Sequence, residues 1–288
     1  MAGNVNADNF VAQIWDASII RTLEDNLIAR KICKAVPAIR AKGAGDTVYF
    51  NGLADPTIAA YTGSLTYEAL VSSQVALLID QQSSYAFKVT DVEAQMANVD
   101  LKGSQASRAA YGLKKAVDTY IFGASTAPAV VDAGTTLAAD TTTDSATILS
   151  DISEFGRVLE EKNVIEGDKW LVISPWVKEK LILAGVKFSI NEGINGQGGM
   201  AWANYLGIDI FVSNNLYNSG TTASPVTTVI GGSYNAIVYE DVLMESRAMQ
   251  LESSFDVGVS GLLVYGAKVV KPAELVKRIM TYTAETAI

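Results

Sequence analysis

Apolar residues recur at helical spacing over a long stretch in the first half of the chain. The positions are Val92, Met96, Val99, Ala106, Ala110, Leu113, Val117 and Tyr120. Spacings of three, four and seven residues place them on one face of a helix. Thr90-Asp91-Val92-Glu93 fits a capping box at its start, and Gly123 supplies a stop. The pattern predicts one helix over 91–122, about 48 Å long, with a break near Gly103 as the alternative.

The residues before this helix alternate between apolar and polar side chains, as a β-strand does. Val75, Leu77 and Ile79 fall on one side of an extended chain. Upstream, Gly43-Ala44-Gly45-Asp46 is a turn signal, and Thr47-Val48-Tyr49-Phe50 begins like a strand. Two limbs of about 20 residues would reach roughly 65 Å, whereas a globule of this length has a radius of gyration of roughly 19 Å. We therefore expect a two-stranded arm that overhangs its own core and needs a partner surface.

The second half of the chain alternates between helical and strand patterns. Helices are predicted from Ile148 to Leu159 and after Pro175. Strands are predicted at 170–173, 208–212, 226–230, 236–239, 255–259 and 263–265, before a closing segment at 267–272. Residues 124–146 are predicted to be a linker or exposed loop. Residues 1–42 carry one or two amphipathic helical turns, so the chain as a whole is of the α+β class.

Composition limits the class of protein. The 288 residues are 49% hydrophobic and 18% charged, which is typical of a folded chain. No apolar run is long enough for a membrane helix, and the first residues have no secretory-signal pattern. The single cysteine, Cys33, suits a reducing cytoplasm. The net charge of −9 predicts a poor general binder of nucleic acid, although residues 1–42 hold six basic and four acidic residues.

The sequence offers little of the chemistry that enzymes use. It has no histidine, the commonest general base and metal ligand, and one cysteine cannot build a thiolate zinc site. The glycine-rich stretch 193–199 lacks the Gly-Lys-Ser/Thr ending of a phosphate loop. Asp140 and Asp144 lack the further ligands of a calcium loop, and Glu160-Glu161 fits a solvated helix face. We predict no catalytic, cofactor-binding or metal-binding residue, with a hydrolase that uses two carboxylates as the enzyme alternative.

Several short motifs occur in a fixed order along most of the chain. The first is Ile14-Trp15-Asp16-Ala17-Ser18-Ile19-Ile20 with Leu23-Glu24-Asp25-Asn26-Leu27. The second is Gly45-Asp46-Thr47-Val48 with Tyr61-Thr62 and Leu65-Thr66-Tyr67-Glu68. The third is Leu78-Ile79-Asp80-Gln81-Gln82 through Ala86-Phe87-Lys88-Val89-Thr90-Asp91-Val92-Glu93. Ser174-Pro175, Gly207-Ile208 and Tyr265-Gly266-Ala267 follow. In this order and spacing they resemble the major capsid (coat) proteins of tailed bacteriophages, which share the Hong Kong 97-type fold.

The resemblance implies a division of the chain into the parts of that fold. It implies an N-terminal arm at 1–42, an extended β-hairpin loop at 43–88, and a peripheral domain with a long spine helix at 89–145. An axial α/β domain would occupy 146–250, and residues 251–288 would return to the peripheral domain.

The same resemblance implies a function. The chain would assemble with itself through pentamers and hexamers into the icosahedral head around the double-stranded DNA of a tailed phage. It would be formed in the bacterial cytoplasm and be part of the virion. A scaffolding protein, a portal and a decoration protein are the implied partners, with weak, non-specific contact to DNA and none to a membrane.

Two departures from the family pattern matter. There is no Lys or Arg between Lys42 and Lys88, so the loop cannot supply a lysine for the covalent cross-links that some relatives make. We therefore expect a non-covalent shell. Met1 lies only a few residues before the arm, so we expect any scaffold to be a separate chain.

Aromatic and aliphatic residues of the arm and loop are the predicted inter-subunit contacts. They are Trp15, Ile19, Leu23, Tyr49, Tyr61, Tyr67 and Leu77. Three other readings stay open at this point: an encapsulin-like shell that loads protein cargo, another virion or adhesive β-structural protein, and the carboxylate enzyme. Packaged contents would separate the first, fibres or trimers would favour the second, and a monomer with a ligand pocket would favour the third.

Overall fold

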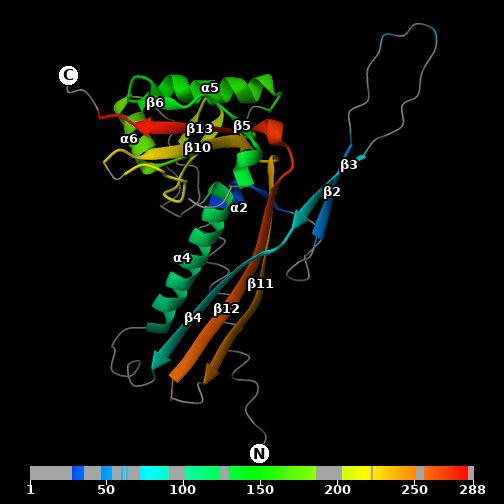
Figure 1. Cartoon of the computed structure of the whole chain (residues 1–288), viewed down its shortest axis with the longest axis vertical. Coiled ribbons are helices and arrows are strands. Elements are labelled where there is room, and N and C mark those ends of the chain that lie inside the picture. Colours follow the sequence, from blue (N-terminus) through cyan, green and yellow to red (C-terminus); the bar gives the residue numbers. More distant parts are fainter. Residues whose placement is uncertain are drawn as a thin grey trace, which may run out of the picture.

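The computed structural model contains two connected sheets and a projecting hairpin (Figure 1). The residues that it describes are 28–35, 47–53, 60, 63, 72–90, 101–123, 130–165, 167–185, 203–221, 223–250 and 256–284. A four-stranded sheet, here called the long sheet, extends away from a seven-stranded sheet, here called the mixed sheet.

The long sheet consists of three long strands and one short one, in the order β1-β11-β12-β4. Their bounds are β1 Lys34–Ala35, β4 Gln81–Thr90, β11 Ile237–Gln250 and β12 Asp256–Val269. β12 pairs antiparallel with both β4 and β11, and β1 pairs parallel with β11. Just before β1 lies the short helix α2, Ile28–Ile32.

One helix, α4 (Leu101–Phe122), runs beside the long sheet (Figure 1). It is continuous through Gly103 and Gly112, so the alternative of a break near Gly103 is wrong within this range. Leu113, Val117 and other apolar residues of its inner face are buried in the largest core cluster. The predicted helix is therefore confirmed over 101–122, and its expected first part, 91–100, lies outside the described residues.

The predicted two-stranded arm begins as the hairpin formed by β2 (Thr47–Leu53) and β3 (Ser72–Leu78). The two strands pair antiparallel from Thr47–Leu78 to Leu53–Ser72. Its base packs on the face of the long sheet opposite α4, where Val48 and Ile79 are buried with Val264. A Cβ on Gly266 would lie 2.4 Å from the Leu78 carbonyl oxygen, so only glycine lets the two backbones approach this closely.

The mixed sheet combines parallel and antiparallel strands in the order β5-β13-β10-β7-β9-β8, and β6 also pairs with β13. Their bounds are β5 Thr135–Thr136, β6 Asp140–Thr143, β7 Lys169–Ile173, β8 Ala203–Tyr205, β9 Ile208–Val212, β10 Val226–Ser233 and β13 Leu275–Tyr282. β7 and β9 are parallel and are joined through helix α6, Pro175–Leu183. Helix α5, Ile148–Glu161, precedes β7.

The core continues from one sheet into the other. Leu171 and Ile173 of β7 face α5 and α6 in one cluster, and Trp170 and Val172 face the other way, into the cluster that holds α4. The alternation follows from the opposite directions of successive side chains in a strand. Because one cluster contains residues of both sheets and of α4, the two parts share a single packed interior.

Residues 124–146 contain more structure than the linker that their composition predicted. They contain the short 3-10 helix η1 (Val130–Ala133) and the strands β5 and β6. Both strands pair with β13. β13 itself was missed, because Lys277 and Arg278 interrupt its apolar pattern. Arg278 is nevertheless buried, since carboxylates of α5 pair with it.

The two sheets do not follow the residue ranges expected for the domains, and those ranges stay a prediction. β11 falls inside the range expected for the axial domain, 146–250, but it belongs to the long sheet. β13 falls inside the range expected to return to the peripheral domain, 251–288, but it belongs to the mixed sheet, which it enters after the turn η2 (Pro272–Glu274). The chain thus leaves the mixed sheet after β10 and returns to it only at Leu275.

Candidate assembly surfaces

Two of the seven predicted contact residues lie in the described part of the chain. Tyr49 on β2 exposes 55% of its surface, so it is available to a partner. The other five lie outside the described residues: Trp15, Ile19, Leu23, Tyr61 and Tyr67.

Leu77 has no exposed surface and is corrected to a core residue of its own chain. It is buried with Val48, Ile79, Val238 and Val264, where the base of the hairpin meets the long sheet. The alternation of apolar and polar residues in β3 is present in the structure, but the apolar side of the strand packs within the subunit. The exposed neighbour Leu78 points the other way and is 48% exposed.

Two adjoining hollows of about 350 and 320 Å³ lie along β4 and β12, both lined by Ala86 and Ser260. Lys88 and Met249 line the first, and Arg247 lines the second. The hollows form where small residues lie in the sheet. Ser260 pairs with Ala86, and Gly258 pairs with Lys88. No local sequence pattern indicates this surface, because it forms only where three separate strands are paired.

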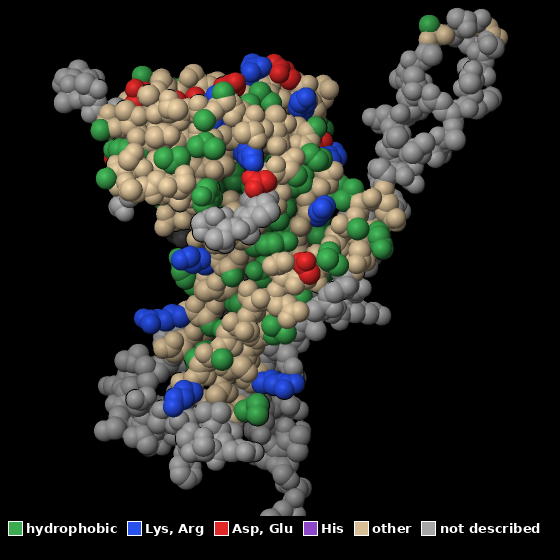
Figure 2. All heavy atoms as spheres, in the orientation of Figure 1, with side chains coloured by type: hydrophobic (Ala, Val, Ile, Leu, Met, Phe, Trp, Pro, Cys, Tyr) green, Lys and Arg blue, Asp and Glu red, His purple; other side chains and the backbone are tan. Residues whose placement is uncertain are grey.

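Positive side chains gather around the lower part of the molecule (Figure 2). On β4, β11 and α4 of the described part, Lys88, Arg247, Arg108 and Lys115 are exposed. Around the mixed sheet both signs are present, and Arg157 pairs with Glu161 and Glu154 on α5.

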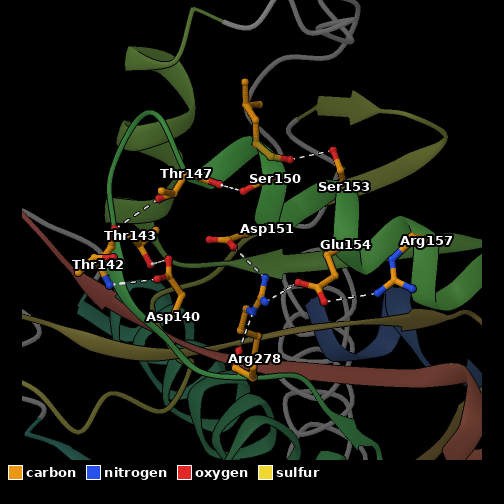
Figure 3. A network of polar contacts seen from close by, with 12 residues as sticks. Asp140, Thr142, Thr143, Thr147, Ser150, Asp151, Ser153, Glu154, Arg157 and Arg278 are labelled. Atoms are coloured by element: carbon orange, nitrogen blue, oxygen red, sulfur yellow. Dashed lines mark hydrogen bonds and ion pairs between the residues drawn. The ribbon is translucent and has the colours of Figure 1, made fainter.

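A buried polar network fastens β13 to α5 (Figure 3). Arg278 Nη1 donates to Asp151 Oδ1 at 2.8 Å, its Nη2 pairs with Glu154, and its Nε donates to the Ala138 carbonyl oxygen at 2.8 Å. The guanidinium thus meets three acceptors on two segments, which suits its planar, forked donors. Arg278 therefore occupies a buried strand position of the kind that usually holds an apolar residue.

Two carboxyl groups of this network have opposite pKa shifts. Burial, and then the neighbouring Asp140, raise the pKa of Asp151 to about 7, against the attraction of Arg278. Partial burial acts to raise the pKa of Asp140, but hydrogen bonds from Thr143 and Thr142 outweigh it and lower that pKa. Asp151 Oδ2 is buried and has no hydrogen-bond partner among the described residues. A proton on this oxygen would let it donate to a neighbouring carboxylate.

The acidic residues considered for metal binding are used within the fold. Asp140 accepts hydrogen bonds from Thr142 and Thr143, and Asp144 accepts them from Ala146 and Thr147. No group of three or more metal-ligating side chains occurs within the described residues. The glycine-rich stretch 193–199 lies outside them. None of the helices in the described part is long and apolar enough to cross a membrane.

Comparison with known families identifies the class of protein. A model of the family described as phage capsid protein matches residues 81–277, well over half of the chain. The chain belongs to the phage capsid protein family. The matched range runs from the first residue of β4 to the third residue of β13, so it includes α4, the three long strands of the long sheet and most of the mixed sheet.

Solved capsid structures share the fold across most of the chain. A solved structure from Mycobacterium phage Che8 is 24% identical, with a TM-score of 0.62, covering 81% of this chain and 84% of that one. The capsid protein of Ralstonia phage GP4 is 14% identical, with a TM-score of 0.64 and coverage of 89% and 88%. That of cyanophage P-SCSP1u is also 14% identical, with a TM-score of 0.63 and coverage of 88% and 87%. A search of curated proteins found no match.

These findings confirm the expected family and the Hong Kong 97-type capsid fold. The capsid subunit is a structural protein of the phage virion. Sequence patterns located the exposed hairpin through its alternation and its lack of basic residues. They missed the hollows on the long sheet and the Arg278 network, because both bring together residues far apart in the chain.

Proposed function

We propose that this capsid subunit assembles through pentamers and hexamers into the icosahedral head of a tailed phage, around double-stranded DNA. The observation that carries the proposal is the hairpin of β2 and β3, which projects from the packed core (Figure 1). An isolated two-stranded hairpin is only marginally stable in water, so an extended one needs a second surface. In a shell, neighbouring copies supply that surface.

The surface that best fits this hairpin is the pair of hollows on the long sheet of a neighbouring copy. The chain from residue 43 to residue 80 contains Asp46, Asp55, Glu68 and Asp80 and no basic residue. The hollows are bordered by Lys88 and Arg247. The opposite charges would guide the two surfaces together, and the small residues of the hollows would let a backbone lie close. Trp15, Ile19, Leu23, Tyr61 and Tyr67 complete the proposed contacts.

Further properties belong to the same proposal. The subunit performs no catalysis, and its shell is formed in the host cytoplasm. A scaffolding protein, a portal and a decoration protein are the further partners that we propose for the shell. The acidic chain touches packaged DNA weakly, mainly through its mildly basic first 42 residues. The phage family match favours DNA over the protein cargo of an encapsulin-like shell.

The hairpin contact is tested by Tyr49→Ser, with Tyr111→Ser as the matched control. The two tyrosines have similar exposure, 55% and 63%, but Tyr111 lies on α4 and has no part in the proposed contact. We expect both variants to fold, and we expect Tyr49→Ser alone to reduce the yield of closed shells, by about tenfold for a lost aromatic anchor. Equal shell yields from both variants, measured by light scattering, would contradict the proposed contact.

A further inference from the structure

One buried carboxylate, Asp118, joins three segments that are distant in sequence. It lies on α4 with no exposed surface. Its Oδ1 accepts a hydrogen bond from the Ala29 backbone amide of α2 at 3.3 Å. Its Oδ2 accepts one from the side-chain amide of Asn215, in the loop after β9, at 3.0 Å. A single side chain thus links the segment of α2, the helix beside the long sheet, and the mixed sheet.

Each partner of Asp118 is itself held in place. Ala29 lies in the first turn of α2, where backbone N–H groups have no acceptor within the helix. Asn215 donates its backbone N–H to Ser213 Oγ at 3.1 Å, and the Ser213 amide donates to the Ile173 carbonyl oxygen of β7 at 2.9 Å. The tie from Asp118 therefore reaches the mixed sheet through a fixed loop.

Few charged or titratable groups among the described residues lie around Asp118. Burial raises the pKa of Asp118 to about 6, opposed by the hydrogen bonds from Asn215 and Ala29 and by the positive charge of Lys114 on α4. From the side of α2, Cys33 is a buried thiol whose pKa is raised by burial and by Asp118. Arg30 of α2 pairs with Asp241 of β11 at 3.4 Å. Asn215, from the third element, does not titrate.

A carboxylate in this place is a costly way to stabilise a core. Leu113, Val117 and Ile121 of the same helix are buried in the surrounding cluster, and an apolar side chain of similar shape would pack there without the cost of burying a charge. What an apolar residue cannot do is orient two hydrogen-bond donors from separate segments.

We propose that Asp118 is a positioning residue that fixes α2, and with it the place of Ile28, against α4 and the mixed sheet. The link to assembly rests on the proposed function, in which residues of the N-terminal arm, 1–42, contact neighbouring copies. The fastening of α2 itself is a property of the isolated subunit.

The fastening is measured by hydrogen exchange of the full chain, in peptides that cover 28–35 and 213–216. Because the folded-state pKa is raised, the neutral form of Asp118 stabilises the closed junction. That contribution is complete below the ordinary pKa of about 4 and is lost as pH rises through about 6. After correction for intrinsic exchange, we expect local opening in the native protein to increase about tenfold from pH 5 to pH 7.5.

Three variants separate positioning from simple packing. Asp118→Leu keeps the shape but removes both acceptors, so exchange of the two peptides should rise while the global unfolding midpoint is unchanged or higher. Asp118→Asn keeps an acceptor without titrating, so the pH dependence should disappear. Asp151→Asn, the control, removes the other carboxyl with a strongly raised pKa and should leave the pH profile of the α2 peptide as it is.

Native-like protection of both peptides in Asp118→Leu would overturn the proposal, as would a pH dependence that persists in Asp118→Asn. If the leucine variant does not fold, the asparagine profile decides alone. Shell formation is scored separately on the same samples. Failure of all samples, native included, to form shells counts against the proposed function and leaves the exchange result valid.

Discussion

Arg278 is the residue whose role is furthest from what its place in the sequence indicates. It lies in a strand of the mixed sheet, is only 6% exposed, and meets carboxylates that precede it by 127 and 124 residues. A basic pair beside a short apolar run predicts a surface turn. The pairing with α5 reverses that expectation, because a buried guanidinium is tolerated when carboxylates and a carbonyl oxygen accept its hydrogen bonds. No local pattern carries this information.

Replacing Arg278 with Ala should therefore be strongly destabilising. The change leaves Asp151, Asp140 and Glu154 close together without their positive partner, and removal of one member of a buried ion pair costs about 3–5 kcal/mol. Glu154 is 35% exposed, and solvent weakens its ion pair with Arg278. We therefore expect a loss of stability at the lower end of that range. Denaturant unfolding of the isolated subunit measures it.

Arg157→Ala is the control for this prediction, because Arg157 pairs with Glu154 and Glu161 on the outer face of the same helix, α5. It should change the unfolding midpoint little, since exposed ion pairs contribute little to stability. A control loss as large as that of Arg278→Ala would show that burial is not the cause.

Among the elements, those with a strong period could be predicted and those stabilised by distant partners could not. The apolar face of α4 and the alternation of β3 are local patterns, and both elements form as expected over their described ranges. β5, of two residues, exists only because β13 offers an edge to pair with. The same limit explains Leu77, whose burial depends on the crossing of the hairpin base over β12.

Alanine substitutions at two glycines should have opposite effects, because Gly266 lies in the contact between the hairpin base and β12 and Gly112 lies in open space on α4. Gly266→Ala would place a Cβ 2.4 Å from the Leu78 carbonyl oxygen, so the hairpin base must shift, at a cost of about 1–3 kcal/mol. Gly112→Ala, within α4, meets no atom within 4 Å and should stabilise the subunit by about 0.5–1 kcal/mol. Thermal unfolding of both variants measures the difference. A stabilising effect of Gly266→Ala would contradict the close crossing.

At the scale of the whole molecule, the subunit combines a closed core with projecting parts that the core cannot cover. The shared interior of the two sheets supplies a rigid centre. The hairpin and the hollows on the long sheet are the complementary surfaces proposed to join copies. The absence of lysine between residues 43 and 87 predicts that this joint is non-covalent. Denatured particles should therefore give single chains by mass spectrometry, and a ladder of linked subunits would contradict this.

Cryo-electron microscopy of particles formed by the full chain, with the other head proteins of its phage supplied if it stays monomeric alone, tests the central claim most directly. We predict closed shells built of five- and six-membered rings, with each hairpin lying over the long sheet of a neighbour. Open fibres, shells in which the hairpins contact nothing, or a chain that stays monomeric with every head protein present would contradict the account.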